Sequence, residues 1–314
     1  MPALSASAPG KIILFGEHSV VYQQPAIAVP VMEVKAIAIA SPAIGKPSNT
    51  VQVIAPDIEI NSTLKTLPLD HAISMAIDLT LKELGISDYP AFNLRISSTI
   101  PLAAGLGSGA SVSVAIIRVV SNFLGQTLSD EVVSQLAYEV EKIHHGTPSG
   151  IDNSVVTFAQ PVYFIKDRLL ETFPIGKPFT IVIGDTGIKS STAVSVGDVR
   201  KAWQADQKVY EDFFESCGTI AKKAREHIEN GEIKKLGPLM DENHALLQKM
   251  NVSSKELDTL VLASRDAGAW GAKLSGGGRG GNMIALVDED SSENVADALM
   301  NTGAVQTIIT KVGN

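Results

Sequence analysis

The sequence predicts an α+β fold of two domains rather than a doubly wound parallel sheet. The first observation is size, because 314 residues with 45% hydrophobic content can bury a sizeable core, and this length fits one large domain or, as we favour, two of ordinary size. The second is that strand-like and helix-like segments mix in both halves without the regular alternation typical of parallel sheets. The third is a composition shift near residues 167–178, which marks a candidate boundary between domains spanning residues 1–172 and 173–314.

Short apolar runs bounded by glycine, proline or charged residues predict the strands. KIILFG is the first of these runs, and VPVMEVKAIAIA follows it with partial alternation of apolar and polar residues. The predicted strands cover residues 11–16, 29–40, 92–101, 179–187, 272–276, 282–287 and 305–312.

Apolar residues repeated at helical spacing, together with capping residues, predict the helices. Gly85 follows one such run at the position of a C-terminal cap, and Ser253 with Glu256 forms a capping box before another. Glycine and proline at Gly231 and Gly237–Pro238 are expected to interrupt the charged helical region that precedes it. The predicted helices cover residues 70–84, 111–123, 129–145, 195–250 with those interruptions, 253–267 and 291–300.

Composition excludes several classes of protein. A formal net charge of −8 argues against a nucleic-acid or membrane-surface protein, so an anionic ligand would need a local binding site. Cys217 is the single cysteine, which excludes an intramolecular disulfide and fits a reducing compartment. The first residues do not have the pattern of a signal peptide, and no apolar run approaches the ~20 residues of a membrane span. We expect a soluble, cytoplasmic protein.

The segment PLAAGLGSGASVSVA, Pro101 to Ala115, lies between a predicted strand and an apolar helix. Glycine lets backbone N–H groups approach a ligand closely, and a helix N-terminus carries partial positive charge, so the segment predicts a phosphate-binding loop. It is not a Walker A loop, because that motif occurs nowhere in the chain. A tight strand-to-helix turn, with small residues for packing, is the alternative.

Three further segments carry titratable residues beside structural ones. PGKIILFGEHSVVY places Lys11 and the pair Glu17–His18 at the two ends of an apolar run, either where a strand surfaces or around a pocket. EKIHHGTPSGIDNSV carries Glu141 and Asp152, and this aspartate could also simply cap the following turn. KLSGGGRGGNMIAL is a second glycine-rich loop between two predicted strands.

This set of segments resembles the GHMP kinase superfamily and, within it, most closely the mevalonate kinase family. The likeness covers nearly the whole chain, through PGKIILFGEHSVVY, PLAAGLGSGAS, HHGTPSGIDN, GDTGIKSST and KLSGGGRGGN in that order. The resemblance implies an N-terminal ribosomal-protein-S5-like domain with the phosphate loop and catalytic residues, a C-terminal ferredoxin-like GHMP domain, and an active site between them. It implies ATP-dependent phosphorylation of the 5-hydroxyl of mevalonate in isoprenoid biosynthesis.

The resemblance also implies roles for individual residues. Asp152 matches the family's catalytic base, and Lys11 beside it would keep that carboxylate ionised and offset charge on the moving phosphoryl group. Glu141 matches a ligand of Mg²⁺, with Ser108 as the expected second oxygen donor. Substrate contacts are expected from Glu17, His18 and Thr192. Of these, His18 could hold the carboxylate or a hydroxyl of mevalonate. The residues expected to bind the ATP phosphates are Gly105, Leu106, Gly107, Ser108, Gly109, Ala110 and Ser111. No cofactor beyond Mg²⁺ and ATP is expected.

Two positions depart from the family pattern. Gly109 stands where the family has a serine thought to reach the metal, so Ser108, Ser111 or a water would have to supply that oxygen. Arg279 stands where glycine is common, either as a solvent-facing side chain or as a phosphate contact.

Three functions remain open at the level of sequence. The first is mevalonate 5-kinase, and the second is another GHMP kinase of the same pathway, acting on phosphomevalonate or on a different hydroxyl of mevalonate. The third is a non-catalytic nucleotide-binding member of the fold, which would be expected to have lost Lys11, Glu141 or Asp152. The charged helices after residue 195 could provide a homodimer surface, as in relatives.

Overall fold

The computed structural model describes residues 2–101, 104–145, 149–168 and 170–313. They form two compact units that alternate along the chain. Unit 1 comprises Met1–Lys11, Val34–Leu102 and Leu106–Ala159, and unit 2 comprises Ile12–Glu33, Ala103–Gly105 and Gln160–Asn314. The units are discontinuous because strands β1 (Leu4–Phe15) and β2 (Ala26–Pro42) each contribute residues to both. The single boundary near residue 172 stays a prediction about the family domains.

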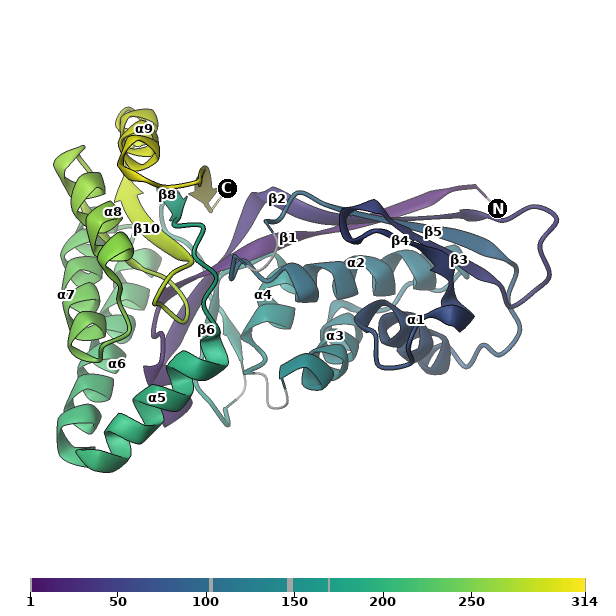
Figure 1. The fold of residues 1–314 in the computed structure, drawn as a ribbon, viewed down its shortest axis with the longest axis horizontal. Helices are drawn as coiled ribbons and strands as arrows, with labels where there is room; N and C mark the ends of the chain where they lie inside the picture. Colours follow the sequence, from purple (N-terminus) through teal and green to yellow (C-terminus); the bar gives the residue numbers. More distant parts are fainter. Residues whose placement is uncertain (1, 102–103, 146–148, 169, 314) are drawn as a thin grey trace. The chain divides into compact units, whose positions relative to one another are not determined.

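Unit 1 contains sheet strands and four helices that pack against one another (Figure 1). Its part of the sheet has the order β4-β3-β5-β2, with β3 parallel to β5 and the other pairs antiparallel. The elements are β3 (Val51–Ala55), β4 (Ile60–Thr63), β5 (Phe92–Ser98), α1 (Ala72–Glu83), α2 (Ser108–Phe123), α3 (Asp130–His145) and α4 (Ile151–Phe158), with short 3₁₀ turns at Pro56–Ile58 and Leu64–Thr66.

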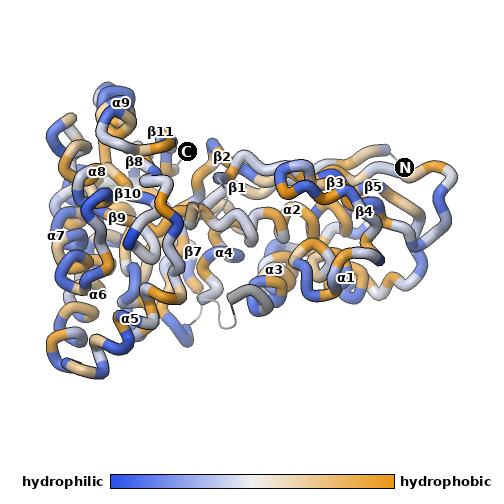
Figure 2. The backbone as a smooth tube through the Cα atoms, in the orientation of Figure 1, coloured by the Kyte–Doolittle hydropathy of each residue, from blue (hydrophilic) through white to orange (hydrophobic). Residues whose placement is uncertain are grey.

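Helix α2 forms the centre of the unit 1 core. It contacts α1, α3 and α4, and most of its residues after the first turn are buried, with hydrophobic and polar residues mixed along the helix (Figure 2). A helix buried on nearly every side needs apolar residues around its circumference, and these are Val114, Ala115, Ile116, Ile117, Val119 and Val120. The position of the α2 N-terminus is therefore fixed by core packing.

Unit 2 is built around an antiparallel sheet of order β11-β8-β10-β9. Helices α7 and α8 contact β9, and α9 contacts β8, so apolar side chains of strands and helices share one core. The elements are β6 (Val162–Phe164), β7 (Glu171–Thr172), β8 (Phe179–Asp185), α5 (Thr192–Ala205), α6 (Gln207–Glu229), α7 (Leu236–Lys249), α8 (Lys255–Asp266), β9 (Gly271–Leu274), β10 (Asn282–Val287), α9 (Ser292–Thr302) and β11 (Gln306–Val312), with 3₁₀ turns at Ser19–Tyr22 and Ile233–Lys235.

Each predicted strand and helix exists, but some predicted boundaries are wrong. Gly237–Pro238 does not interrupt a helix, because both residues lie in the first turn of α7, where proline's missing N–H costs nothing. The unpredicted break lies at Asp206, whose side chain accepts from the Val209 N–H and caps α6. The capping box is also wrong, because Ser254 rather than Ser253 caps α8. None of the helices in the described ranges is long and apolar enough to cross a membrane.

Candidate active site

Lys11 and Asp152 form an ion pair in unit 1, with 3.1 Å between Lys11 Nζ and Asp152 Oδ1. Strand β1 carries the lysine, and the first turn of α4 carries the aspartate. The lysine side chain is only 7% exposed, whereas the aspartate side chain is 32% exposed. The sequence prediction that these two residues act together agrees with this arrangement, in which the carboxylate remains accessible to a ligand.

The glycine loop lies directly against this pair. Gly107 has φ +74°, and a Cβ atom added there would approach the Lys11 Cγ to 2.8 Å and the Asp152 Oδ2 to 3.7 Å. Glycine is therefore required at this position by both backbone conformation and space. The residue also caps α2, so the N-terminus of a sixteen-residue helix begins beside Lys11 and Asp152. This is the arrangement that a phosphate group needs.

The three small residues at the start of α2 differ in what they can offer a metal. Ser111 is fully buried, and its hydroxyl can donate to the Pro9 carbonyl at 2.6 Å or to the Gly107 carbonyl at 2.9 Å. Ser108 is half-buried at the first helical position. Gly109 is exposed, and an added Cβ would meet nothing within 4 Å. Of the two serines, Ser108 is the one whose hydroxyl the structure leaves for a ligand, because Ser111 ties the α2 first turn to β1.

Glu141 places a second carboxyl group near Asp152. It is buried on α3, and burial, followed by the negative charge of Asp152, raises its pKa to about 8, with Lys11 opposing the shift. Helix α4 is fixed against α3 by Asn153, whose amide donates to the carbonyl and hydroxyl of Ser134 at 3.0 and 2.8 Å. This contact holds the elements that carry Asp152 and Glu141 together.

The donor set fits a magnesium–nucleotide complex rather than a closed protein metal site. In the described part of the chain, no group of three or more His, Cys, Asp or Glu side chains could hold a metal. Mg²⁺ uses oxygen ligands, typically one or two carboxylates with phosphates and water, and a cation would favour the ionised form of Glu141. Residues 146–148 of the GTPSGIDN motif lie outside the described residues.

In unit 2, the GEH segment begins at a turn that only glycine can make. Gly16 has φ +95°, and a Cβ atom there would lie 2.4 Å from the Pro25 carbonyl oxygen. The next residue, Glu17, is buried with its Oε1 paired to the Nζ of Lys273, and both side chains are 0% exposed. The expected contact between Glu17 and a substrate therefore stays a prediction, and the structure shows this carboxylate in a supporting position.

His18 is buried, and its neutral form has a definite tautomer. Burial, with opposition from a hydrogen bond to Gly277 and assistance from the charges of Arg279 and Lys273, lowers its pKa to about 4. Nε2 lies 3.1 Å from the Gly277 carbonyl oxygen, which can only accept, so Nε2 carries the proton. Nδ1 is then a bare acceptor, and it has no partner among the described residues. Such an atom accepts from a hydroxyl and does not bind a carboxylate, which favours one of the two roles expected for His18.

Thr192 lies beside the same glycine. A Cβ atom at Gly277 would lie 2.9 Å from Thr192 Oγ1, so the absence of a side chain there brings the threonine hydroxyl against the loop. Thr192 is exposed at the first position of α5. The structure thus brings His18 and Thr192 to one residue of the second glycine-rich loop, as the prediction of shared substrate contacts requires.

Arg279 is held by protein groups in the structure, and the phosphate contact expected for it stays a prediction. Its Nη1 pairs with Asp198 Oδ2 of α5 at 2.6 Å, and its Nε and Nη2 donate to the Asn251 carbonyl at 3.3 Å. The guanidinium is partly exposed and engaged with protein groups, and it links the second glycine loop to the helix that begins at Thr192.

Sequence reasoning missed Lys273. The signal was present in AKLSG, where a lysine stands inside a strand predicted to be buried, because a fully buried lysine is rare unless it is paired. The partner, however, lies 256 residues away, and no local pattern identifies it.

Comparisons with known proteins identify the family of the chain. The model of the GHMP kinases N terminal domain matches residues 71–160, and that of the GHMP kinases C terminal domain matches residues 224–305. The mevalonate kinases of Thermococcus sibiricus and Pyrococcus horikoshii are 39% and 38% identical to the chain, over 98% and 96% of it and 95% and 94% of their own lengths.

Solved structures show the same fold. The L. major mevalonate kinase in complex with R-mevalonate superposes with a TM-score of 0.85 at 29% identity, covering 99% of this chain and 96% of that one. The Methanococcus jannaschii mevalonate kinase superposes with a TM-score of 0.87 at 26% identity, covering 99% and 98%. The chain belongs to the GHMP kinase family and, within it, to the mevalonate kinases.

Proposed function

We propose that the chain transfers the γ-phosphoryl group of ATP to the 5-hydroxyl of mevalonate. The observation that carries the proposal is the Lys11–Asp152 ion pair beside Gly107 of the glycine loop. A relative is a mevalonate kinase solved in complex with R-mevalonate, and the chain matches it along nearly its whole length.

Each part of the unit 1 site has a distinct task in such a reaction. Asp152 accepts the proton of the substrate hydroxyl, late in a loose in-line transfer, so a weak base suffices when it is well positioned. Lys11 stabilises the negative charge that develops on the oxygens, and the backbone N–H groups at the start of α2 bind phosphate. Glu141 and Ser108 would hold Mg²⁺, which when bound neutralises phosphate charge.

The unit 2 residues contribute to substrate recognition. His18 Nδ1 accepts a hydrogen bond from a substrate hydroxyl, and the exposed Thr192 hydroxyl can donate or accept. We further propose a cytoplasmic enzyme that needs only Mg²⁺ and ATP, that forms a homodimer, and whose family domains meet near residue 172.

The test is ADP release by the purified protein with Mg²⁺-ATP and each of mevalonate, phosphomevalonate, galactose and homoserine. NMR of the product then identifies the phosphorylated position, and Asp152→Asn is measured in parallel. Turnover on mevalonate at the 5-hydroxyl, lost in the variant, is the expected result. Phosphate on the 3-hydroxyl, or turnover only on phosphomevalonate, would contradict the proposed substrate and hydroxyl but would leave the proposed active site unchanged. Absence of turnover on all four would overturn the enzymatic proposal.

A further inference from the structure

His18 is the central residue of a strained turn. Its backbone has φ 59° and ψ −48°, and the Ser19 N–H donates to the Glu17 carbonyl at 2.6 Å, two residues back. This is the classic γ-turn, which is rare and strained for any residue with a side chain. A conformation of this kind persists only where the surrounding structure holds it in place, and such conformations cluster at functional sites.

The residues next to His18 show what holds the turn. On one side, Glu17 is fixed by the ammonium group of Lys273, which also donates to the Leu274 carbonyl at 2.5 Å. On the other side, the His18 ring donates to Gly277. Ser275, between these two anchors, donates its hydroxyl to the Ile13 carbonyl at 2.7 Å. Lys273, Ser275 and Gly277 therefore each form a hydrogen bond to the segment Ile13–His18, which leads into the turn and forms it.

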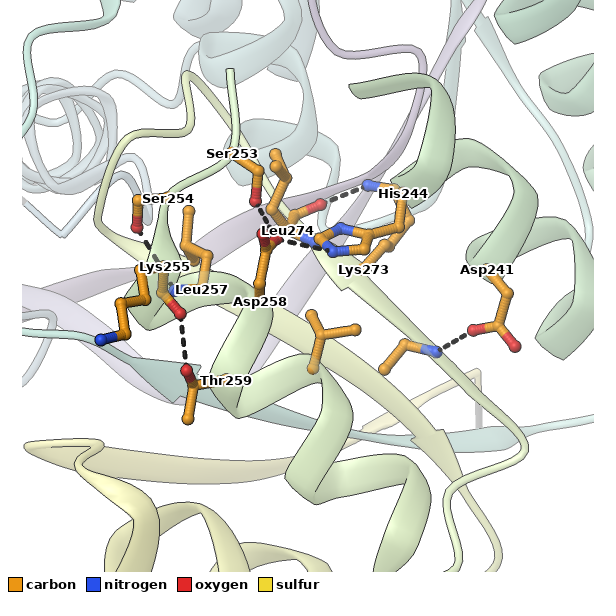
Figure 3. Close-up of polar contacts among 12 residues, drawn as sticks. Asp241, His244, Ser253, Ser254, Lys255, Leu257, Asp258, Thr259, Lys273 and Leu274 are labelled. Atoms are coloured by element: carbon orange, nitrogen blue, oxygen red, sulfur yellow. Dashed lines mark hydrogen bonds and ion pairs between the residues drawn. The ribbon is translucent and has the colours of Figure 1, made fainter. Parts of the chain in front are cut away.

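The backbone next to Lys273 is fixed by a hydrogen-bond network. The Leu274 N–H donates to Nδ1 of His244 at 3.3 Å, and the opposite ring nitrogen donates to Asp258 Oδ1 at 3.1 Å (Figure 3). Ser253 donates to the same Asp258 oxygen at 2.5 Å. The network ties β9 to helices α7 and α8 and so to the core of unit 2.

Glu17 is the counter-charge of the buried Lys273 ammonium. Cys217 also lies near this pair, but burial raises its pKa to about 12, so the thiol stays neutral. The Asn243 amide donates to its sulfur at 3.4 Å and keeps it in the core. A lone ammonium in this environment would be very costly, and the carboxylate compensates for it.

We propose that Lys273 is a positioning residue for substrate binding, which holds His18 in its strained turn by fixing the carboxylate of Glu17. The proposal rests on the proposed function for its kinetic readout. Buried ion pairs often contribute little net stability, because desolvation offsets their attraction, but their directional bonds select one geometry. The geometry selected here is the direction of the His18 Nδ1 acceptor.

The first test is Lys273→Met, which removes the ammonium and keeps most of the side-chain volume. We expect the KM for mevalonate to rise at least about tenfold, equivalent to about 1.4 kcal/mol of binding free energy. The KM for ATP and kcat should stay within about twofold. Lys311→Met is the matched control, because it removes an exposed lysine–carboxylate pair from β11 of the same unit and should change none of these constants.

Two double variants separate the positioning role of Lys273 from its contribution to core packing. They keep the proposal testable even where Lys273→Met alone does not fold. Glu17→Leu/Lys273→Met replaces the pair by apolar side chains, and we expect it to fold but to keep the raised KM for mevalonate. Glu17→Gln/Lys273→Gln removes both charges but allows an amide–amide hydrogen bond, and its KM should return to within about threefold of the parent value. A normal KM in the apolar pair, or an equal loss of both KM values and kcat, would overturn the proposal.

A readout without substrate distinguishes this proposal from the proposed function. Amide hydrogen exchange of Ser19 and Val20, whose N–H groups donate to the Glu17 and Gly16 carbonyls, reports directly on the turn. We expect faster exchange at these amides in the apolar pair than in the amide pair, with exchange in α2 unchanged. Equal exchange in both would overturn the positioning role, whether or not the parent protein phosphorylates mevalonate.

Discussion

Among the residues that the structure describes, two buried lysines are paired with carboxylates, and the two pairs differ in how far the carboxylate is exposed. In unit 1, Lys11 is buried but its partner Asp152 is about one-third exposed. In unit 2, Lys273 and its partner Glu17 are both sealed from solvent. In the open pair, Lys11–Asp152, the carboxylate remains accessible to a ligand. In the sealed pair, Lys273–Glu17, both charged groups are buried and contact only protein groups. We therefore propose that the same two functional groups perform chemistry in unit 1 and fix a backbone turn in unit 2.

The largest expected effect is on the open pair. Asp152→Asn should lower kcat about 10³-fold, because the amide keeps the shape of the carboxylate but cannot accept the proton. Steady-state kinetics measure this loss, and circular dichroism on heating checks that the variant folds. A residual rate within tenfold of the parent would mean that Asp152 is not the base.

Lys11→Met removes the cation of the same pair. We expect kcat to fall about 10²-fold, because a preorganised charge near the developing oxyanion is lost. Lys142→Met, which breaks an exposed pair with Glu139 in unit 1, is the control and should leave kcat unchanged. If both variants behaved alike, the open pair would have no special role.

The surroundings of the sealed pair predict how stability depends on pH. Burial lowers the pKa of His244 to about 4 from its ordinary 6.5, with the charge of Asp258 opposing the shift. Between these two pKa values the unfolded chain binds a proton at His244 that the folded chain does not bind. The contribution of His244 to the free energy of unfolding is therefore complete above pH 6.5 and is lost as the pH falls toward 4. The loss between neutral pH and pH 5 should be about 2 kcal/mol for this group.

Urea unfolding at a series of pH values tests the histidine. His244→Gln keeps an acceptor for the Leu274 N–H and a donor for Asp258 but does not titrate, so its stability should fall less steeply below pH 6.5. His18, whose pKa is lowered to about 4, contributes a similar slope that the variant retains. Identical slopes in variant and parent would show that His244 does not stay neutral in the fold.

Gly107→Ala tests how closely the phosphate loop lies to the open pair. The added methyl group would collide with Lys11 Cγ and sit in a left-handed backbone, so kcat should fall about tenfold and stability by about 1 kcal/mol or more. Gly109→Ala, two residues on, has free space and ordinary helical geometry, and it should be tolerated. Equal effects at both glycines would contradict the contact.

The smallest expected effect is at Gly109 itself. Gly109→Ser introduces a hydroxyl on the exposed surface of the first turn of α2 without a clash. We expect a modest gain in stability, below about 1 kcal/mol, and an apparent affinity for Mg²⁺ that is equal or up to threefold higher. Ser108→Ala should lower the apparent affinity for Mg²⁺ by a larger factor than Gly109→Ser raises it. An unchanged Mg²⁺ titration in Ser108→Ala would assign the second oxygen ligand to water.

Local patterns were sufficient where local chemistry decides the structure. The run before Gly85 predicted α1 to within two residues at each end, because the helical repeat and the glycine cap lie side by side. The run from Ser111 predicted α2 but began three residues late, since Ser108 starts the helix behind a glycine cap that has no side-chain signal. Ser254 caps α8, whereas the Ser253 hydroxyl donates to Asp258, a residue of α8 that also bonds to His244, and no local pattern separates the two serines.

The site divides along the same line. Lys11, Glu141 and Asp152 were identified because a resemblance links their three segments, and the structure brings them together in unit 1. The sealed state of Glu17 could not be predicted, because it depends on a lysine at the other end of the chain. Arg279 likewise pairs with a residue of α5 that no motif indicates.

The most direct test of the account is a rapid-quench, single-turnover comparison of the parent protein with Asp152→Asn and with the double variant Glu17→Gln/Lys273→Gln. Each is measured with saturating Mg²⁺-ATP and mevalonate, so that substrate affinity does not limit the rate. We predict a chemical step about 10³-fold slower in Asp152→Asn, and within about threefold of the parent in Glu17→Gln/Lys273→Gln. Comparable losses in the two variants would contradict the division between an open pair that performs chemistry and a sealed pair that positions the substrate site.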